Sequence, residues 1–335
     1  MNKLSKINFL ISFLLLYIFA GLVTYTPDWG VYLNLFNNEY QISEYFFYAI
    51  KNIVKSMGGE YRDLHIIFTS LTSLSLIFFI SKFTSKTTLV IILFIPTIFV
   101  FYTTQIRFYL AYVLMINSLY FYFVKNNKIA TLSFLILSIL NHYSIVFLLP
   151  YFILLRIKLN HFTKKIILYS LMIMTVFSFL MNIIQKVFNY DMYISVDSKS
   201  SIIGSLFNFL PYIISLLIIN KYYKKFLLKN SKYLDKKIEF LLKMSYLPYL
   251  YLPLAFQFQI IGRRYIYGVL LFQILLAVYT NKFFNISKYR FYIYKTIPLI
   301  VLFILYIYYL PFLIWDDSNR LQNLILILLS NDMFN

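Results

Sequence analysis

Side chains able to bind or transfer a charged group are few in this chain, and several stand at the ends of apolar segments. Arg107 begins a helix in QIRFYLA, His142 follows a short helix in NHYS, and Arg263 and Arg264 lie together in IIGRRYIYGVL. Charge beside a large apolar surface is costly and is usually retained for a purpose. We expect these residues at one face of the protein, where they predict a polar site.

The arginines predict a site for phosphate groups. A helix N-terminus carries free N–H groups and the positive end of the helix dipole, and an arginine adds a full charge there. A guanidinium also matches phosphate oxygens in a two-pronged hydrogen bond. We therefore interpret Arg107, Arg263 and Arg264 as pyrophosphate-binding residues. The alternative is that each of them reaches out to lipid headgroups.

Three residues are candidates for a general base. His142 is the first, because a histidine exchanges its proton near neutral pH. Glu44 precedes the apolar stretch YFFYAI, and Asp28 comes shortly before Tyr32. The alternatives remain that His142 only bonds the backbone at a helix break, and that Glu44 and Asp28 are solvated loop residues. The other acids of that loop, Glu39, Glu60 and Asp63, are interpreted as solvated.

Composition excludes several kinds of chemistry. The chain has no cysteine, which rules out disulfides, thiolate metal sites and a cysteine nucleophile. It has 7 glycines and no glycine-rich phosphate loop. The 3 histidines are far apart, and His65 and His161 are interpreted as structural. We expect neither a metal nor a cofactor.

Hydropathy indicates an all-α integral membrane protein. Of its 335 residues 61% are hydrophobic and 13% charged, and the mean hydropathy is +0.74. The net charge of +19 does not indicate nucleic-acid binding, because the basic residues lie in short loops between apolar segments.

The apolar segments predict a single transmembrane domain over residues 1–335, a bundle of about 11 helices (10–12) with a cytoplasmic N-terminus. Each segment is bounded by charged residues. The predicted spans are 7–25, 64–81, 88–105, 107–124, 129–141, 143–157, 166–185, 202–220, 240–258, 264–281 and 296–314.

The loops follow the positive-inside rule. Most of the 31 lysines and arginines fall on the inner side, whereas only Asp235 and Glu239 of the 12 acidic residues do. The segment 221–243 is predicted to be a basic cytoplasmic loop against anionic headgroups. The outer loop 26–63 is aromatic-rich and predicts an amphipathic helix in the membrane interface.

The segment 129–157 is short for two spans and long for one. A single span would move the later basic loops to the outer side, so we expect two short helices meeting near Asn141 and His142. Short helices leave room for a polar vestibule on the outer side. The tail 321–331 is too short to span and is expected to lie in the interface.

A set of short motifs resembles a known family. These are Asp28 with Tyr32, Glu44 with Tyr45 and Phe46, Ile106-Arg107 with Ala111, and His142 with Ser144, in that order. The chain resembles the EpsG-type branch of the Wzy-like polysaccharide polymerases. The motifs cover about residues 25–145. The resemblance in hydropathy extends over most of the chain. The asparagine before His142 departs from the usual pattern.

The resemblance implies a glycosyltransferase of the cytoplasmic membrane. Its reaction would join undecaprenyl-pyrophosphate-linked oligosaccharide repeat units into a capsular, exopolysaccharide or O-antigen chain on the outer face. Arg107, Arg263 and Arg264 would bind the leaving pyrophosphate, and His142, Glu44 or Asp28 would act on the attacking hydroxyl. Besides the lipid-linked substrate and membrane lipids, a flippase and a chain-length regulator are the implied partners.

Other classes of membrane protein remain open. A flippase or transporter of lipid-linked oligosaccharide would favour a polar path through the membrane and broken helices, and Pro248 and Pro253 do interrupt one segment. A membrane glycosyltransferase or ligase using the same carrier would share the arginines. An acyltransferase would need an inner-face site, where only His161 is available.

Overall fold

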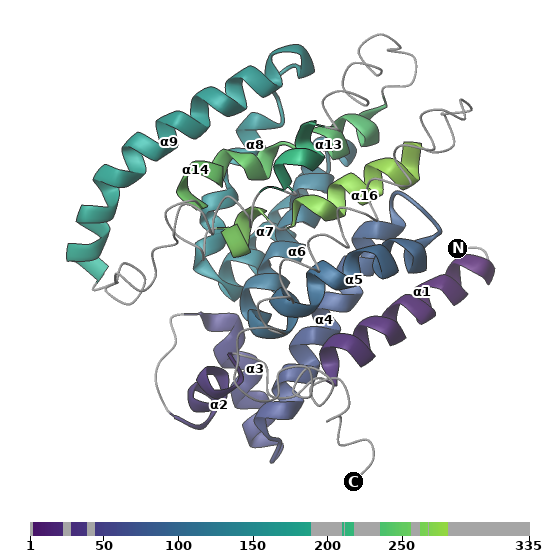
Figure 1. Cartoon of the computed structure of the whole chain (residues 1–335). Coiled ribbons are helices and arrows are strands. Elements are labelled where there is room, and N and C mark those ends of the chain that lie inside the picture. Colours follow the sequence, from purple (N-terminus) through teal and green to yellow (C-terminus); the bar gives the residue numbers. More distant parts are fainter. Residues whose placement is uncertain are drawn as a thin grey trace, which may run out of the picture. The chain divides into compact units, whose positions relative to one another are not determined.

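The computed structural model describes residues 3–22, 28–38, 44–188, 210, 212–217, 235–255, 262–266 and 268–280. Every regular element in these ranges is a helix (Figure 1). The described residues divide into two compact units, one ending at Phe152 and the other beginning at Ile153. The all-helical prediction is therefore confirmed for the described part of the chain.

The first unit holds the predicted site residues of the N-terminal half. Its elements are α1 (Lys3–Leu16) with a π-helical turn η1 (Tyr17–Gly21), α2 (Trp29–Asn37), α3 (Tyr45–Ser56), α4 (Tyr61–Ser81), α5 (Thr87–Thr104), α6 (Ile106–Tyr120) with a π-helical turn η2 (Phe121–Lys125), α7 (Lys128–Asn141) and a 3-10 helix η3 (Tyr143–Leu148). The short α8 (Pro150–Leu154) crosses the unit boundary.

The second unit contains one long helix and several short helical pieces. Its elements are α9 (Leu159–Phe188), α13 (Lys236–Met244), a 3-10 helix η7 (Leu247–Tyr251), α14 (Leu252–Ala255), a π-helical turn η8 (Gly262–Ile266) and α16 (Val269–Thr280). The predicted span 240–258 is thus broken into short helical pieces where Pro248 and Pro253 interrupt the backbone ladder.

Within the described residues two helices are long and apolar enough to cross a membrane, Tyr61–Ser81 and Ile106–Lys125. Shorter apolar helices are Ser5–Gly21, Lys128–Asn141, Tyr143–Leu154 and Arg264–Thr280. The prediction of about 11 spans is therefore not confirmed. The predicted span 296–314 and the tail 321–331 lie outside the described residues, as do most of 202–220 and of the basic loop 221–243.

Polar residues at the helix ends explain several of the boundaries. Glu60 and Asp63 form a capping box at the start of α4, with the Glu60 N–H donating to the Asp63 carboxylate at 2.8 Å. These two acids therefore start a helix instead of being merely solvated. Asn126 takes a left-handed conformation (φ 50°), and Asn127 caps α7 by accepting from the Ala130 N–H at 3.0 Å.

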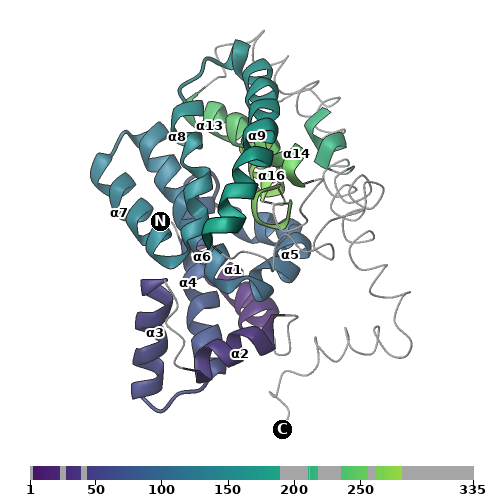
Figure 2. The same cartoon turned by 90° about the vertical axis from the view of Figure 1, so that its left-hand side faces the viewer.

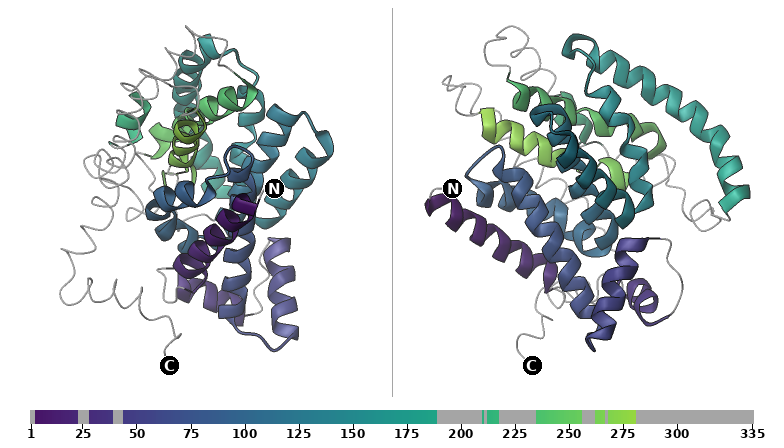
Figure 3. Two further views of the ribbon diagram at one scale, coloured as in Figure 1. Left: turned by 90° about the vertical axis from the view of Figure 1, so that its right-hand side faces the viewer. Right: turned by 180° about the vertical axis from the view of Figure 1, so that it is seen from behind.

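Helix α6 is the buried centre of the first unit. Every residue from Ile106 to Tyr120 is buried except Arg107. Helices α4, α5 and α7 pack against it, while α1 runs along α4 and α5 (Figure 3). A helix enclosed in this way is accessible chiefly at its ends, and Arg107 lies in its first turn.

Helix α7 is tied to α6 in a fixed antiparallel register. Ser118 donates to the carbonyl of Thr131 at 2.7 Å, and Ser138 donates to the carbonyl of Ala111 at 2.6 Å. At the end of the pair, the Asn141 amide donates to the carbonyl of Arg107. Small polar side chains of this kind allow close helix contact. The register places the end of α7 beside the first turn of α6.

The described end of the basic segment 221–243 is helical. Asp235 caps α13 by accepting from the Ile238 N–H at 2.7 Å. Lys243 is buried, donates to the Leu155 carbonyl at 2.7 Å and pairs with Glu239 at 2.6 Å. The contact of this segment with lipid headgroups stays a prediction, but Lys243 serves the interior of the second unit.

Candidate functional site

The predicted outer loop 26–63 forms two helices, α2 and α3, which lie beside α4 (Figure 2). Lys51 fastens them together. Its ammonium donates to the Leu35 carbonyl at 2.6 Å and the Asn38 carbonyl at 2.7 Å, and the residue is 2% exposed. These carbonyls lie at the C-terminus of α2, where a cation is favoured by the helix dipole. The clamp sets the position of α3 and of Glu44, which precedes it.

We expect Lys51→Met to lower the free energy of unfolding by about 1–3 kcal/mol, because two carbonyls at the end of α2 lose their buried donor. Lys55→Met is the comparison on the same helix, because Lys55 also reaches the end of α2 but donates only to the Asn37 carbonyl, at 3.3 Å and from an exposed position. Lys55 is exposed, so its replacement should cost less than about 0.5 kcal/mol. Denaturant titration in detergent micelles measures both variants. Equal losses in the two would contradict the clamp.

Glu44 and Arg107 form a partly buried ion pair. The Arg107 Nη1 donates to Glu44 Oε2, and the side chains are only 18% and 9% exposed. Glu44 is the residue before α3, and Arg107 lies in the first turn of α6, so the pair joins two segments that are 63 residues apart. Direct pairing with the guanidinium offsets the cost of burying the Glu44 carboxylate.

Aromatic rings hold the same guanidinium. The Arg107 Cζ lies 5.1 Å from the ring centre of Tyr32 and 5.1 Å from that of Phe47. Burial raises the pKa of the Tyr32 hydroxyl, and the nearby Arg107 lowers it by less. Tyr32 therefore stays protonated at neutral pH, which makes it a hydrogen-bond donor and excludes it as a general base.

His142 stands at the break between α7 and η3. Helix α7 ends at Asn141, and His142 has an extended backbone (φ −157°, ψ 116°), as expected for two helices meeting here. Its Nδ1 lies 3.3 Å from Glu44 Oε1, 3.2 Å from the Ser144 backbone N and 3.1 Å from Ser144 Oγ. Its ring lies 5.6 Å from the ring centre of Phe108, with the two planes nearly perpendicular. The Asn141 hydrogen bond to α6 fixes the chain beside His142, while Glu44 and Ser144 contact the imidazole itself.

The structure thus brings together three of the predicted site residues, Glu44, Arg107 and His142. The cluster has a carboxylate between a guanidinium and an imidazole at the N-terminal end of α6, and the three side chains are 9–18% exposed. Such an arrangement can hold an anion near the guanidinium and move a proton at the imidazole. We call it the Glu44 cluster.

The sequence pattern of the EpsG family matches residues 6–323. The chain belongs to the EpsG family. The match covers nearly the whole chain, including both described units and every predicted site residue. No curated protein and no solved structure matches the chain. Family membership and the apolar helices together support a membrane protein of polysaccharide biosynthesis.

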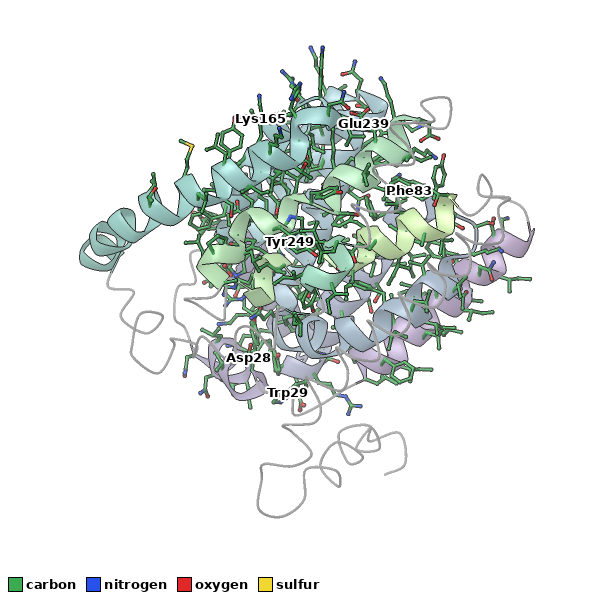
Figure 4. The ribbon with its side chains drawn as sticks, turned by 45° about the horizontal axis from the view of Figure 1, so that its top comes forward. Asp28, Trp29, Phe83, Lys165, Glu239 and Tyr249 are labelled. Atoms are coloured by element: carbon green, nitrogen blue, oxygen red, sulfur yellow. The ribbon has the colours of Figure 1, made fainter. Side chains whose placement is uncertain are left out.

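Asp28, the third candidate base, stands at the N-terminal end of α2, four residues before Tyr32. It precedes α2, and its carbonyl accepts the Tyr32 N–H at 3.0 Å. Its carboxylate acts electrostatically on the Tyr32 hydroxyl. Figure 4 shows Asp28 and Trp29 at the start of this helix. Trp29 packs against Tyr61 at 4.7 Å and His65 at 5.2 Å between ring centres.

Arg263 and Arg264 lie in the π-helical turn η8 of the second unit, before α16. Arg264 is partly buried, and its neighbour Tyr265 packs against Tyr251 at 5.0 Å. The side chain of Arg263 is outside the described residues. That these arginines share a pyrophosphate site with Arg107 stays a prediction.

Sequence reasoning missed three supporting residues. Lys51 has no motif, although a lysine inside an otherwise apolar helix face of α3 is a signal of burial. Asn141 was visible only as the neighbour of His142, yet its side chain donates the hydrogen bond that ties the end of α7 to the Arg107 carbonyl in α6. Ser144 was recognised as part of a motif but not as a partner of Nδ1. In the described part no three histidine, aspartate or glutamate residues group as metal ligands.

Proposed function

We propose that this EpsG-family protein is a polysaccharide polymerase. It joins oligosaccharide repeat units carried on undecaprenyl pyrophosphate at the outer face of the bacterial cytoplasmic membrane, which it crosses many times. A hydroxyl of the acceptor unit attacks the anomeric carbon of the donor chain, and the lipid pyrophosphate leaves. No nucleotide is needed, because the pyrophosphate linkage supplies the free energy.

The observation that carries this proposal is the convergence of Glu44, Arg107 and His142 in one cluster. The reaction needs positive charge where the pyrophosphate departs and a base where the hydroxyl attacks. Arg107 supplies the first at the N-terminal turn of α6, where the helix dipole adds to its charge. The Glu44–His142 pair supplies the second. Arg263 and Arg264 give a further basic site for the pyrophosphate.

The test is a deletion of the gene in its host, followed by electrophoresis of lipid-linked and surface glycan. We expect long chains to disappear while single repeat units are still made and exported. Wild-type protein should restore the ladder, whereas Arg107→Ala, Arg264→Ala and His142→Ala, expressed at equal levels, should not. Arg156→Ala is the control, because Arg156 is exposed and lies away from the predicted motifs.

Each other outcome favours a different class. Loss of single units from the outer face would mean a flippase, for which the interrupted helices η7 and α14 offer a candidate path. Long chains that persist without reaching their final acceptor would mean a ligase. A polymerase of this kind is expected to work with a flippase and a chain-length regulator.

A further inference from the structure

The Glu44 cluster contains two groups that are able to accept a proton, and its geometry assigns them different roles. We infer that Nε2 of His142 is the atom that takes the proton from the attacking hydroxyl, and that Glu44 is a positioning residue which holds the imidazole. The inference rests on the proposed polymerase function and deepens it, because it decides between two candidate bases.

The contacts of Glu44 make it a poor base. One carboxylate oxygen, Oε2, accepts from Arg107, and the other, Oε1, faces His142 Nδ1 at 3.3 Å. The guanidinium stabilises the ionised carboxylate and so reduces its tendency to take a proton. A substrate hydroxyl would also have to displace one of these partners to reach it. Glu44 is therefore placed to orient the imidazole.

The contacts of Nδ1 impose a choice on His142. Nδ1 must carry a hydrogen to donate to Glu44 Oε1, but must present a lone pair to accept from the Ser144 N–H at 3.2 Å. The first state leaves Nε2 with a lone pair, ready to take a proton. The second puts the hydrogen on Nε2, which then cannot act as a base. The hydrogen bond in the structure is the one from Ser144, so the inferred role of Glu44 is to favour the first state through its charge at 3.3 Å.

The groups that face His142 fit this assignment. Glu44 approaches from the start of α3, and Arg107 lies behind Glu44 in α6. Phe108, also in α6, presents its ring at a right angle to the imidazole. Tyr143 follows His142 in the chain, with Tyr45 and Glu44 nearby. Glu44 is thus the carboxylate that the described structure places at the ring, and it stabilises the imidazolium formed in the reaction.

The step balances without another reactant. As the acceptor oxygen bonds to the anomeric carbon, its proton passes to Nε2 of His142. The hydrogen on Nδ1 stays on the imidazole and points at the Glu44 carboxylate. The bond from the anomeric carbon to the phosphate oxygen breaks, and the pyrophosphate leaves with the electron pair. The imidazolium then returns its proton to the pyrophosphate or to water, which restores the starting state.

The test uses full-length protein in liposomes with lipid-linked single repeat units, and measures the rate of chain elongation against pH. His142→Gln should lose about 10²–10⁴-fold in rate at every pH. Glu44→Gln should lose less, about 10–10³-fold, and keep an acidic limb moved to lower pH, because the imidazolium is no longer stabilised by a carboxylate. His161→Gln is the matched histidine control and should leave the profile unchanged.

A rescue experiment separates the base from the residue that positions it. Added imidazole should restore part of the elongation by His142→Gly, whereas acetate should not restore Glu44→Ala to the same degree. The reverse pattern would overturn the inference, as would a His142→Gln protein that keeps the acidic limb while Glu44→Gln loses all activity. If wild-type protein lengthens no chain in liposomes but moves single units across the bilayer, the proposed function itself fails and this inference falls with it.

Discussion

Replacing Arg107 with methionine is expected to abolish chain elongation and to destabilise the protein by about 3–5 kcal/mol. The loss of stability arises because Glu44 would be left as a mostly buried carboxylate without its charge partner. The rings of Tyr32 and Phe47 would also lose the cation between them. The loss of activity arises because no full positive charge would remain at the first turn of α6. Elongation in liposomes and denaturant titration in micelles measure the two effects.

Arg107→Lys separates charge from shape. A lysine keeps the charge but cannot form the planar contact with two rings, so we expect it to recover part of the stability and at most about a tenth of the rate. Arg156→Met, at an exposed arginine, is the control and should change neither. An Arg107→Met protein that elongates chains at more than a tenth of the wild-type rate would remove Arg107 from the site.

Exchanging the two charges is the second change with a large expected effect. Glu44→Arg alone would set two cations against each other in a mostly buried position, and Arg107→Glu alone would do the same with two carboxylates. Each should cost at least about 3–5 kcal/mol. In the double variant an ion pair forms again, so we expect at least half of that loss to be recovered.

Activity should not follow stability in the exchange. The double variant would present a guanidinium to Nδ1 of His142. A guanidinium cannot accept a hydrogen bond from the ring, and its charge repels the imidazolium. We therefore expect a folded protein without elongation. Coupling energy from the full set of single and double variants measures the pair directly. A stable double variant with wild-type elongation would mean that the pair has only a structural role.

The residues of the cluster were predictable from the sequence, but their partners were not. Arg107, His142 and Glu44 each lie next to an apolar segment, and the cost of charge there made them candidates. Their pairing depends on how α3 packs on α4 and α7 and on the α6–α7 register, which no local pattern encodes. Arg107 was interpreted as a phosphate ligand, and its contact with Glu44 appears only once the helices are packed.

The extent of helix was also predictable, whereas the number of membrane crossings was not established. The break at His142 followed from the length of the segment 129–157 and the charge of the later loops, and the structure places it at that residue. The capping box at Glu60 was readable as a local signal and was overlooked. Span counting rests on apolar length alone, and helices such as α7 and α14 are shorter than a bilayer requires.

The ties between α6 and α7 have a mechanical consequence. A slip of one helix along the other by a single turn would break the hydrogen bonds of Ser118, Ser138 and Asn141 at once. We therefore expect α6 and α7 to move together as a rigid body. Arg107 and His142 belong to this helix pair, whereas Glu44 directly precedes α3. In the proposed polymerase, opening this cluster to a large glycan would move α3 away from α6 and α7, and that movement would have to break the Glu44–Arg107 ion pair.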